Sequence, residues 1–107
     1  MSNNHFRQQL IAAGLWDIND LRDPSLTPAA CDDLELRCQA EFPQAKNWII
    51  SYIGIKNDPL PYRIYLSDRT EIFALEATRS RVICQAALRL THLHEKEATH
   101  AFVAGKD

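Results

Sequence analysis

The feature that most limits the fold is a change of hydrophobic period at Asn47. Before it, apolar residues recur every three or four positions, which is typical of amphipathic helices. From Asn47 to Lys56 the sequence NWIISYIGIK alternates instead and is rich in aromatic and β-branched residues, which favour strands. A chain of 107 residues has the length of one domain. The change of period predicts that this domain (1–107) is α+β, with an acidic helical part at 1–45 and a β-meander plus a final helix at 46–107.

The first part of the chain predicts an opening helix over residues 3–13, with its apolar side chains on one face. Gly14 ends it, because glycine readily adopts the left-handed conformation found after a helix. A short turn of helix is expected at 16–23. Trp16 and Leu21 would anchor this turn, and its three aspartates would face water.

A second helix is expected from Pro28 to about Glu41, where Pro43 stops it. Thr27 would cap it, and proline at the first helical position loses no hydrogen bond. Its inward stripe consists of Ala30, Leu34 and Cys38, with Cys31 at the margin. The three cysteines, Cys31, Cys38 and Cys84, form no CxxC pair and lie among apolar neighbours, so we interpret them as reduced core residues.

Three strands in an antiparallel meander follow. The stretch 47–56 has apolar residues on both faces, which predicts a central strand or one covered on both sides. A loop with two prolines separates it from a hairpin of strands 62–66 and 70–76 around residues 67–69. Tyr62, Ile64 and Leu66 would share one face, and Phe73 and Leu75 would form the matching set across the turn. The predicted element order is α-α-β-β-β-α.

The last helix begins in EATRSRVICQAALRL, residues 76–90. Thr78 is expected to be its N-cap, and an apolar stripe would cover the sheet. That stripe consists of Val82, Ala86, Leu90 and Leu93, with Ile83 and Ala87 beside it. Arg79 and Arg81 fall elsewhere, either on a solvated face with ion pairs to the acidic half or in contact with an anion or partner.

This stretch resembles the closing helix of small bacteriophage and prophage proteins of the ABA-sandwich type. In those proteins a run A-x-x-x-A-I-C-x-A-A-L follows a short antiparallel sheet, and Ile83-Cys84-Gln85-Ala86-Ala87-Leu88 is similar to it. The similarity covers about residues 47–93, while Arg81-Val82 departs from the small or apolar residues usual there. The resemblance implies a phage-type accessory protein and supplies no activity.

Charge favours a protein partner over a polyanion. The net charge is -2, and it divides into -4 over residues 1–45 and +2 over the remainder. Non-specific nucleic-acid binding needs several basic contacts, and this balance does not supply them. The alternative is a nucleic-acid-binding module with a basic strip of Arg63, Arg79, Arg81 and Arg89 beside stacking tyrosines.

No catalytic or metal motif stands out. In THLHEKEATH, residues 91–100, His92 and His94 point apart on a helix, so the two-histidine pair of a zinc protease is absent. Cys84 lies in an apolar helix interior, where nothing lowers its pKa for nucleophilic attack. We therefore expect no enzyme, no metal and no cofactor. The start MSNNHFRQQL lacks a secretory signal pattern and no apolar run reaches membrane-spanning length, so a cytoplasmic protein without membrane contact is expected.

The expected function is a small protein-binding accessory protein, for example a phage-encoded inhibitor of a host defence protein. Its partner would be a host or phage protein, and a homodimer is one form of the interaction. The candidate contact residues are the aromatic and basic side chains of the sheet and last helix: Trp48, Tyr52, Tyr62, Tyr65, Arg79 and Arg81. The alternative for the aromatic face is that the N-terminal helices cover it.

Overall fold

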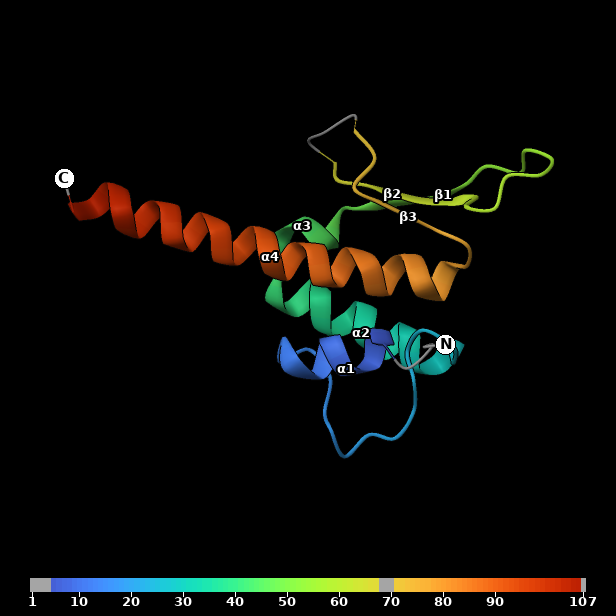
Figure 1. Ribbon diagram of the computed structural model, residues 1–107, viewed down its shortest axis with the longest axis horizontal. Helices are drawn as coiled ribbons and strands as arrows, with labels where there is room; N and C mark the ends of the chain where they lie inside the picture. Colours follow the sequence, from blue (N-terminus) through green and yellow to red (C-terminus); the bar gives the residue numbers. More distant parts are fainter. Residues whose placement is uncertain (1–4, 68–70, 107) are drawn as a thin grey trace.

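The computed structural model describes the backbone of residues 5–67 and 71–106 and the side chains of residues 5–67 and 71–95. The order of its elements, α-α-α-β-β-β-α, confirms the predicted α+β class. The helices are α1 (His5–Ala12), α2 (Pro28–Glu41), α3 (Pro43–Lys46) and α4 (Arg79–Lys106), and the strands are β1 (Ile49–Tyr52), β2 (Tyr62–Tyr65) and β3 (Ala74–Glu76). In Figure 1 the sheet lies on one side of α4, and α1 and α2 lie on the other.

The end of α1 confirms the role predicted for Gly14. This glycine has φ +79°, the left-handed conformation. The N–H of Leu15 donates to the carbonyl of Leu10 at 2.9 Å, and the N–H of Gly14 donates to that of Ile11 at 3.0 Å. These are the two bonds of a Schellman motif, and they fold the buried Leu15 back onto the helix. The predicted start at residue 3 or 4 lies outside the described residues.

The expected helical turn at 16–23 is wrong, because this segment forms turns without a helix. Trp16 is buried as expected, whereas Leu21 is 86% exposed and anchors nothing. Asp17 faces water, while Asp20 and Asp23 are half-buried. Their carboxylates accept hydrogen bonds from the turn itself, which is the structure that replaces the helix.

The bounds predicted for α2 are confirmed, and so is its stripe, since Ala30, Leu34 and Cys38 are fully buried. Thr27 occupies the N-cap position with an extended backbone, but its side chain makes no capping bond. Residues 43–46 form the short helix α3, which the sequence did not predict. Phe42 is extended, as the residue before a proline must usually be, and Pro43 then starts a new turn that buries Ala45.

The sheet is the predicted antiparallel meander, with the order β1-β2-β3. The central strand is β2, so the prediction that residues 47–56 form a central or doubly covered strand is wrong. β1 is an edge strand of four residues, and α4 packs against β2 and β3. Ile49 and Ile55 are 56% and 61% exposed. The apolar residues on both faces of this stretch are therefore not all explained by burial.

The pairing of β2 with β3 differs by one residue from the predicted faces. Ala74 pairs with Ile64, so Leu75 pairs with Arg63 and points to the opposite face. The N–H of Phe73 also donates to the Ile64 carbonyl, at 2.8 Å. Two residues of one strand thus oppose one residue of the other, as in a β-bulge, and Phe73 packs against the buried core as predicted. Residues 68–70 of the predicted turn lie outside the described residues.

The core is one continuous cluster that runs from α1 to the sheet through α4. The predicted stripe of α4 is confirmed, because its members through Leu90 are buried and Leu93 packs against them. Ile64 of the central strand is fully buried on the sheet side of this helix. Thr78 caps α4 as predicted: its Oγ1 accepts the N–H of Arg81 at 3.1 Å.

Candidate functional site

The four aromatic residues predicted to form a partner surface do not form one patch. Trp48 is buried, and its Nε1 donates to Glu35 Oε2 of α2 at 3.1 Å. Tyr52 and Tyr62 contact each other, with ring centroids 5.0 Å apart. The register places Tyr65 on the other face of the sheet. The structure therefore joins only the two tyrosines at the base of the β1–β2 loop.

The N-terminal helices do not cover the sheet face that carries Tyr65. Both α1 and α2 pack against α4, and α4 lies between them and the sheet (Figure 1). The expectation that these helices close the second face is therefore wrong for the described residues. The open face is only partly apolar, because Ser51 and Arg63 lie on it between the neighbouring apolar side chains.

Arg79 and Arg81 both have acidic partners. Arg79 lies 3.6 Å from Asp32 Oδ1 and 3.4 Å from Glu35 Oε1, both on α2. This is the ion pairing with the acidic half that the sequence suggested. Arg81 instead pairs with Glu76 of β3, with its Nε 3.0 Å from Oε1. Contact of either arginine with an anion stays a prediction, and it would compete with these carboxylates.

The other two arginines of the predicted basic strip are also engaged. Arg63 lies 3.7 Å from Asp58 Oδ2, and Arg89 donates to the carbonyl of Phe73 at 2.8 Å. The strip is therefore divided among partners on the strands, the β1–β2 loop and α2. A nucleic-acid surface here would have to displace these contacts.

Polar side chains of α4 close the outer edge of β3. Gln85 Oε1 accepts the N–H of Leu75 at 2.8 Å, and Arg89 donates to the carbonyl of Phe73. These two backbone groups do not point at β2, so α4 takes the place of a further strand. Gln85 is held in turn by Glu76, whose Oε2 lies 3.3 Å from its Nε2.

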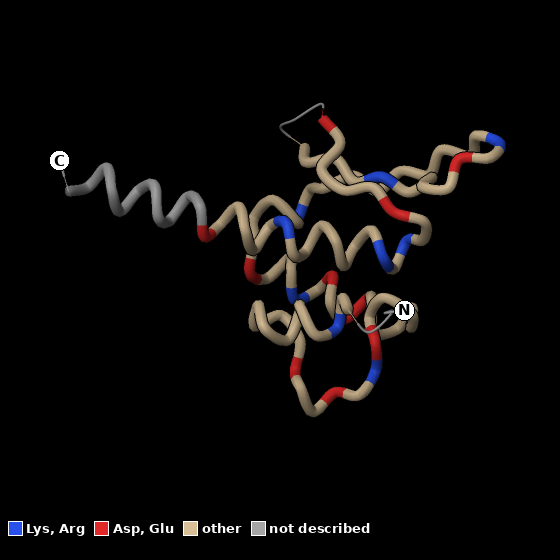
Figure 2. The backbone as a smooth tube through the Cα atoms, in the orientation of Figure 1, with Lys and Arg blue, Asp and Glu red and all other residues tan. Residues whose placement is uncertain are grey.

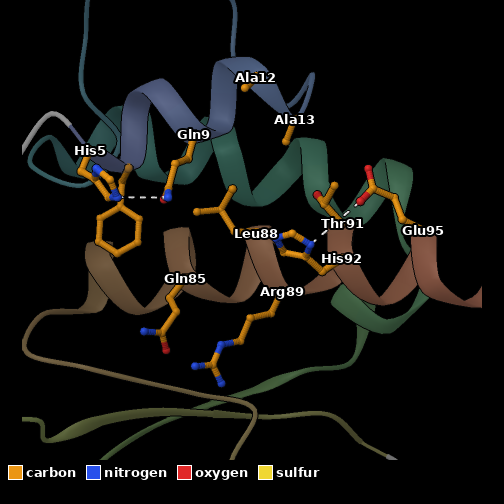
Figure 3. Close-up of a pocket in the computed structure, with 11 residues that line it drawn as sticks. His5, Gln9, Ala12, Ala13, Gln85, Leu88, Arg89, Thr91, His92 and Glu95 are labelled. Atoms are coloured by element: carbon orange, nitrogen blue, oxygen red, sulfur yellow. Dashed lines mark hydrogen bonds and ion pairs between the residues drawn. The ribbon is translucent and has the colours of Figure 1, made fainter.

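A groove of about 490 Å³ runs along α1 and α4 (Figure 3). Phe6 and Leu88 supply its apolar part, and His5 and Gln9 lie along the α1 side with their side-chain nitrogens 3.1 Å apart. The hydroxyl of Thr91 donates to the backbone of its own helix at 3.1 Å. The acceptor of that hydroxyl is the carbonyl of Ala87.

His92 and His94 of the THLHEKEATH stretch are exposed residues of α4. His92 Nδ1 lies 3.9 Å from Glu95 Oε1, and His94 packs edge-on against the ring of Phe42 at 5.3 Å. Among the side chains that the structure describes, no group of three potential ligands is placed to hold a metal. The side chain of His100 lies outside this part of the chain.

All three cysteines are fully buried and unpaired, as the sequence predicted. Burial raises the pKa of Cys31 to about 11 and that of Cys38 to about 12. The same cause raises the pKa of Cys84 above its ordinary value. Burial therefore favours the neutral thiol over the thiolate that nucleophilic attack requires.

The surface that the sequence did not predict is the α1–α2 loop, residues 13–27. Three aspartates in it accept a hydrogen bond from the backbone N–H two residues further on, which is the Asx turn. The pairs are Asp17–Asn19 at 2.9 Å, Asp20–Arg22 at 3.1 Å and Asp23–Ser25 at 2.9 Å. The three-residue spacing of these aspartates is the signal in the sequence that could have indicated successive turns.

Two arginines fasten this loop to the helices. Arg7 of α1 donates to the carbonyl of Ile18 at 3.1 Å and to that of Asp20 at 2.9 and 3.2 Å. Arg22 pairs with Asp20 at 2.8 Å and with Asp33 of α2 at 2.9 Å. The hydrogen bond from Arg22 lowers the pKa of Asp20 to about 2, so this contact stays charged at neutral pH.

Trp16 fixes the start of the loop. Its ring is buried, with the guanidinium carbons of Arg22 and Arg37 at 5.6 and 5.3 Å from the ring centroid. Cations at this distance are attracted to the face of an indole. Its Nε1 donates to the carbonyl of Arg22 at 3.2 Å, and Arg37 donates to that of Leu15 at 3.4 Å. The loop is thus ordered by polar contacts from both neighbouring helices.

This ordered loop exposes large apolar side chains. Ile18, Leu21 and Leu26 are 67%, 86% and 57% exposed. Figure 2 shows acidic residues spaced along the same loop. The α1–α2 loop is therefore an acidic surface with exposed apolar side chains, and hydrogen bonds and ion pairs hold its backbone.

Within the described residues, no helix combines the length and the apolar character needed to cross a membrane. The similarity of the closing helix to phage proteins of the ABA-sandwich type stays a prediction. Comparisons of the chain with protein-family models, with curated proteins and with solved structures gave no significant match.

Proposed function

We propose that this protein is a non-enzymatic binding protein that docks the α1–α2 loop onto another protein. The observation that carries the proposal is that a loop held by contacts from Arg7, Arg22 and Trp16 exposes Ile18 and Leu21. These two side chains, with Leu26, would be the apolar anchors. An inhibitor of a host defence protein is one form of such docking.

Energetics support this use of the loop. Burying one large aliphatic side chain that was exposed contributes about 1.5–3 kcal/mol. A flexible loop would lose part of that gain to the entropy of becoming ordered on binding. The α1–α2 loop has already lost part of this freedom on folding, because Arg7 holds its backbone and Arg22 joins it to Asp33 of α2. More of the free energy gained by burying these apolar side chains therefore contributes to binding.

Charge indicates the chemistry of the partner. Residues 1–45 carry a net charge of -4, and Asp17, which adjoins Ile18 in the loop, is exposed. A matching surface would place basic side chains around an apolar hollow. Opposite charges at the rim of an interface mainly accelerate association, and salt weakens that effect. Binding should therefore slow as salt is added, while the apolar anchors keep dissociation slow.

The experiment is capture of a partner from a lysate of the native cells, compared across matched variants. Leu21→Ser and Ile18→Ser remove a proposed anchor, while Leu36→Ser changes a residue that is 64% exposed on α2. The expected result is one protein recovered by the wild-type chain and by Leu36→Ser, and at least about tenfold weaker binding by the loop variants. Circular dichroism should be the same for all four chains.

Equal recovery by the loop variants and the wild-type chain would refute the proposed surface. Nuclease treatment separates this proposal from the alternative that uses Arg63, Arg79, Arg81 and Arg89. Binding that disappears with nuclease and falls steeply with salt would support a nucleic-acid module instead. Failure to recover any partner under low-salt conditions would also count against the proposal.

A further inference from the structure

The two edges of the sheet differ in how their backbone groups are occupied. At β3, side chains of α4 bind the outward N–H of Leu75 and the outward carbonyl of Phe73. At β1, no strand of the described chain pairs with the outer edge. Natural proteins usually protect such an edge with lysine, proline, a bulge or a covering segment. β1 reads IISY and carries no charge and no proline.

The register identifies which groups of β1 point outward. Tyr52 pairs with Tyr62, and the next residue, Ile53, donates its N–H to the carbonyl of Pro61 at 2.9 Å. Hydrogen-bonded pairs alternate along an antiparallel ladder, so Ser51 and Ile49 also direct their backbone groups at β2. The N–H and C=O groups of Ile50 and Tyr52 therefore face away from the sheet.

We infer that a second copy of this chain pairs its own β1 antiparallel to this edge. With a two-fold axis at Ser51, Ile50 of each copy lies opposite Tyr52 of the other. Both residues have outward backbone groups, so each pair exchanges N–H···O bonds in both directions. The two meanders then form one continuous six-stranded sheet whose outer edges are the two closed β3 edges. The inference does not rest on the proposed docking loop.

Side chains and charge are compatible with this pairing. Residues directly opposite in an antiparallel pair project to the same face. Tyr52, which is 63% exposed, would meet Ile50 of the second copy on the side of the helices, and Ile49 would meet Ile53 on the open face. Residues 47–55 contain no charged side chain, so the two-fold places no like charges opposite each other within the strand. A partner selected by charge would gain nothing at this edge.

The arrangement of helices leaves room beside β1. α4 packs against β2 and β3, while the main contact of β1 is with β2 (Figure 1). The α1–α2 loop lies on the far side of the helices from the sheet. Pairing through β1 therefore leaves that loop accessible in the dimer.

The first test measures mass against concentration by analytical ultracentrifugation. The wild-type chain is expected to approach twice its 12.2 kDa at high concentration and to dissociate on dilution. Tyr52→Pro removes an outward N–H that β2 does not use, and proline is tolerated at such edge positions. Dimerisation should weaken at least about tenfold, the loss of roughly 1.4 kcal/mol. Tyr52→Thr is the matched control, because it loses the same ring and keeps the N–H.

Dimerisation that is equally strong in Tyr52→Pro and Tyr52→Thr would overturn the inference, and so would a wild-type chain that is monomeric at every concentration. A second variant keeps the test decisive if the proline prevents folding. Ser51→Cys places a thiol on the two-fold axis, where two opposed Cα atoms of a non-hydrogen-bonded pair lie about 4.5 Å apart, within the range of a disulfide.

Under mild oxidation Ser51→Cys should form a covalent dimer much faster than Ser67→Cys, although Ser67, which lies outside β1, is the more exposed of the two serines. The native cysteines are fully buried and should not contribute. Equal rates for the two variants would exclude the pairing at Ser51. A disulfide that forms fast in Ser51→Cys and slowly when Ile50 or Tyr52 is also replaced would establish the β1–β1 pairing.

Discussion

At the residue scale, the two threonines that precede the long helices carry the same sequence signal, but only one of them makes a capping hydrogen bond. Thr27 and Thr78 both occupy N-cap positions, and both were expected to cap. Thr78 accepts the N–H of Arg81, whereas the side chain of Thr27 makes no capping bond. Pro28 lacks only the N–H of the first helical position, whereas a cap accepts from the second or third residue, so the proline does not replace the missing bond of Thr27.

Thr78→Ala is therefore expected to lower the free energy of unfolding by about 1 kcal/mol, the usual value of a side-chain cap. Thr27→Ala should change it by no more than a few tenths. Urea denaturation followed by circular dichroism measures both values under the same conditions. Equal losses in the two variants would show that the contact of Thr78 with Arg81 does not stabilise α4.

Local physics explains which residue-level predictions succeeded. Gly14 could be recognised because a left-handed helix end favours glycine wherever it occurs. Leu21 could not be placed, because its exposure depends on the path of the loop, which Arg7 of α1 and Asp33 of α2 contact from outside it. The pattern of apolar residues at 16–23 indicates a preference for burial and does not say whether the surrounding loop permits it.

At the element scale, α4 does more than cover the sheet. Its apolar stripe buries the face that includes Ile64, while Gln85 and Arg89 bond to the edge of β3. For Arg79 the sequence predicted either ion pairs with the acidic half or contact with an anion or partner, and the structure has ion pairs with α2. The bonds of Gln85 and Arg89 to the edge of β3 were not visible in the helical pattern.

Gln85→Ala should uncover the N–H of Leu75, which is half-buried and has no other strand beside it. We expect a loss of about 1–2 kcal/mol in the free energy of unfolding, since a donor would be left unsatisfied. Amide hydrogen exchange at Leu75 should accelerate, while exchange at Ser51, inside the β1–β2 ladder, stays as slow as before. Gln8→Ala on the exposed side of α1 is the matched control. Unchanged exchange at Leu75 would contradict the role of Gln85.

The period of NWIISYIGIK correctly predicted a strand and wrongly predicted its place in the sheet. Apolar residues on both faces predict neighbours on both sides. In the structure, Trp48 faces the helices and Ile49 stays exposed on the open face. The hydrophobic period shows which side chains are apolar and does not show how many strands lie beside them. In sequence, an edge strand with apolar residues on both faces therefore resembles a central strand.

At the scale of the whole molecule, a single core joins the acidic N-terminal part to the sheet. Leu10 of α1, Leu34 of α2 and Ile64 of β2 belong to one cluster. Arg79 adds ion pairs from α4 to α2 on the surface. This continuity favours cooperative unfolding of the described core as one unit, while a single domain over residues 1–107 stays a prediction.

The two tryptophans allow a direct test, because Trp16 reports on the α1–α2 loop and Trp48 on the contact of the sheet with α2. In Trp16→Phe and in Trp48→Phe, the fluorescence of the remaining tryptophan and far-ultraviolet circular dichroism should give the same urea midpoint. A fluorescence midpoint that precedes the dichroism midpoint in either variant would show that one part unfolds separately.

In the α1–α2 loop, the residues that hold the backbone are not the residues that expose apolar side chains. Arg7, Arg22 and Trp16 set the path of the backbone, whereas Ile18 and Leu21 contribute little to holding it. The conformation of the loop and the apolar side chains on its surface therefore depend on different residues. The displayed side chains can be exchanged with little cost to folding, so a lineage that must follow a changing partner could alter its specificity there by single substitutions.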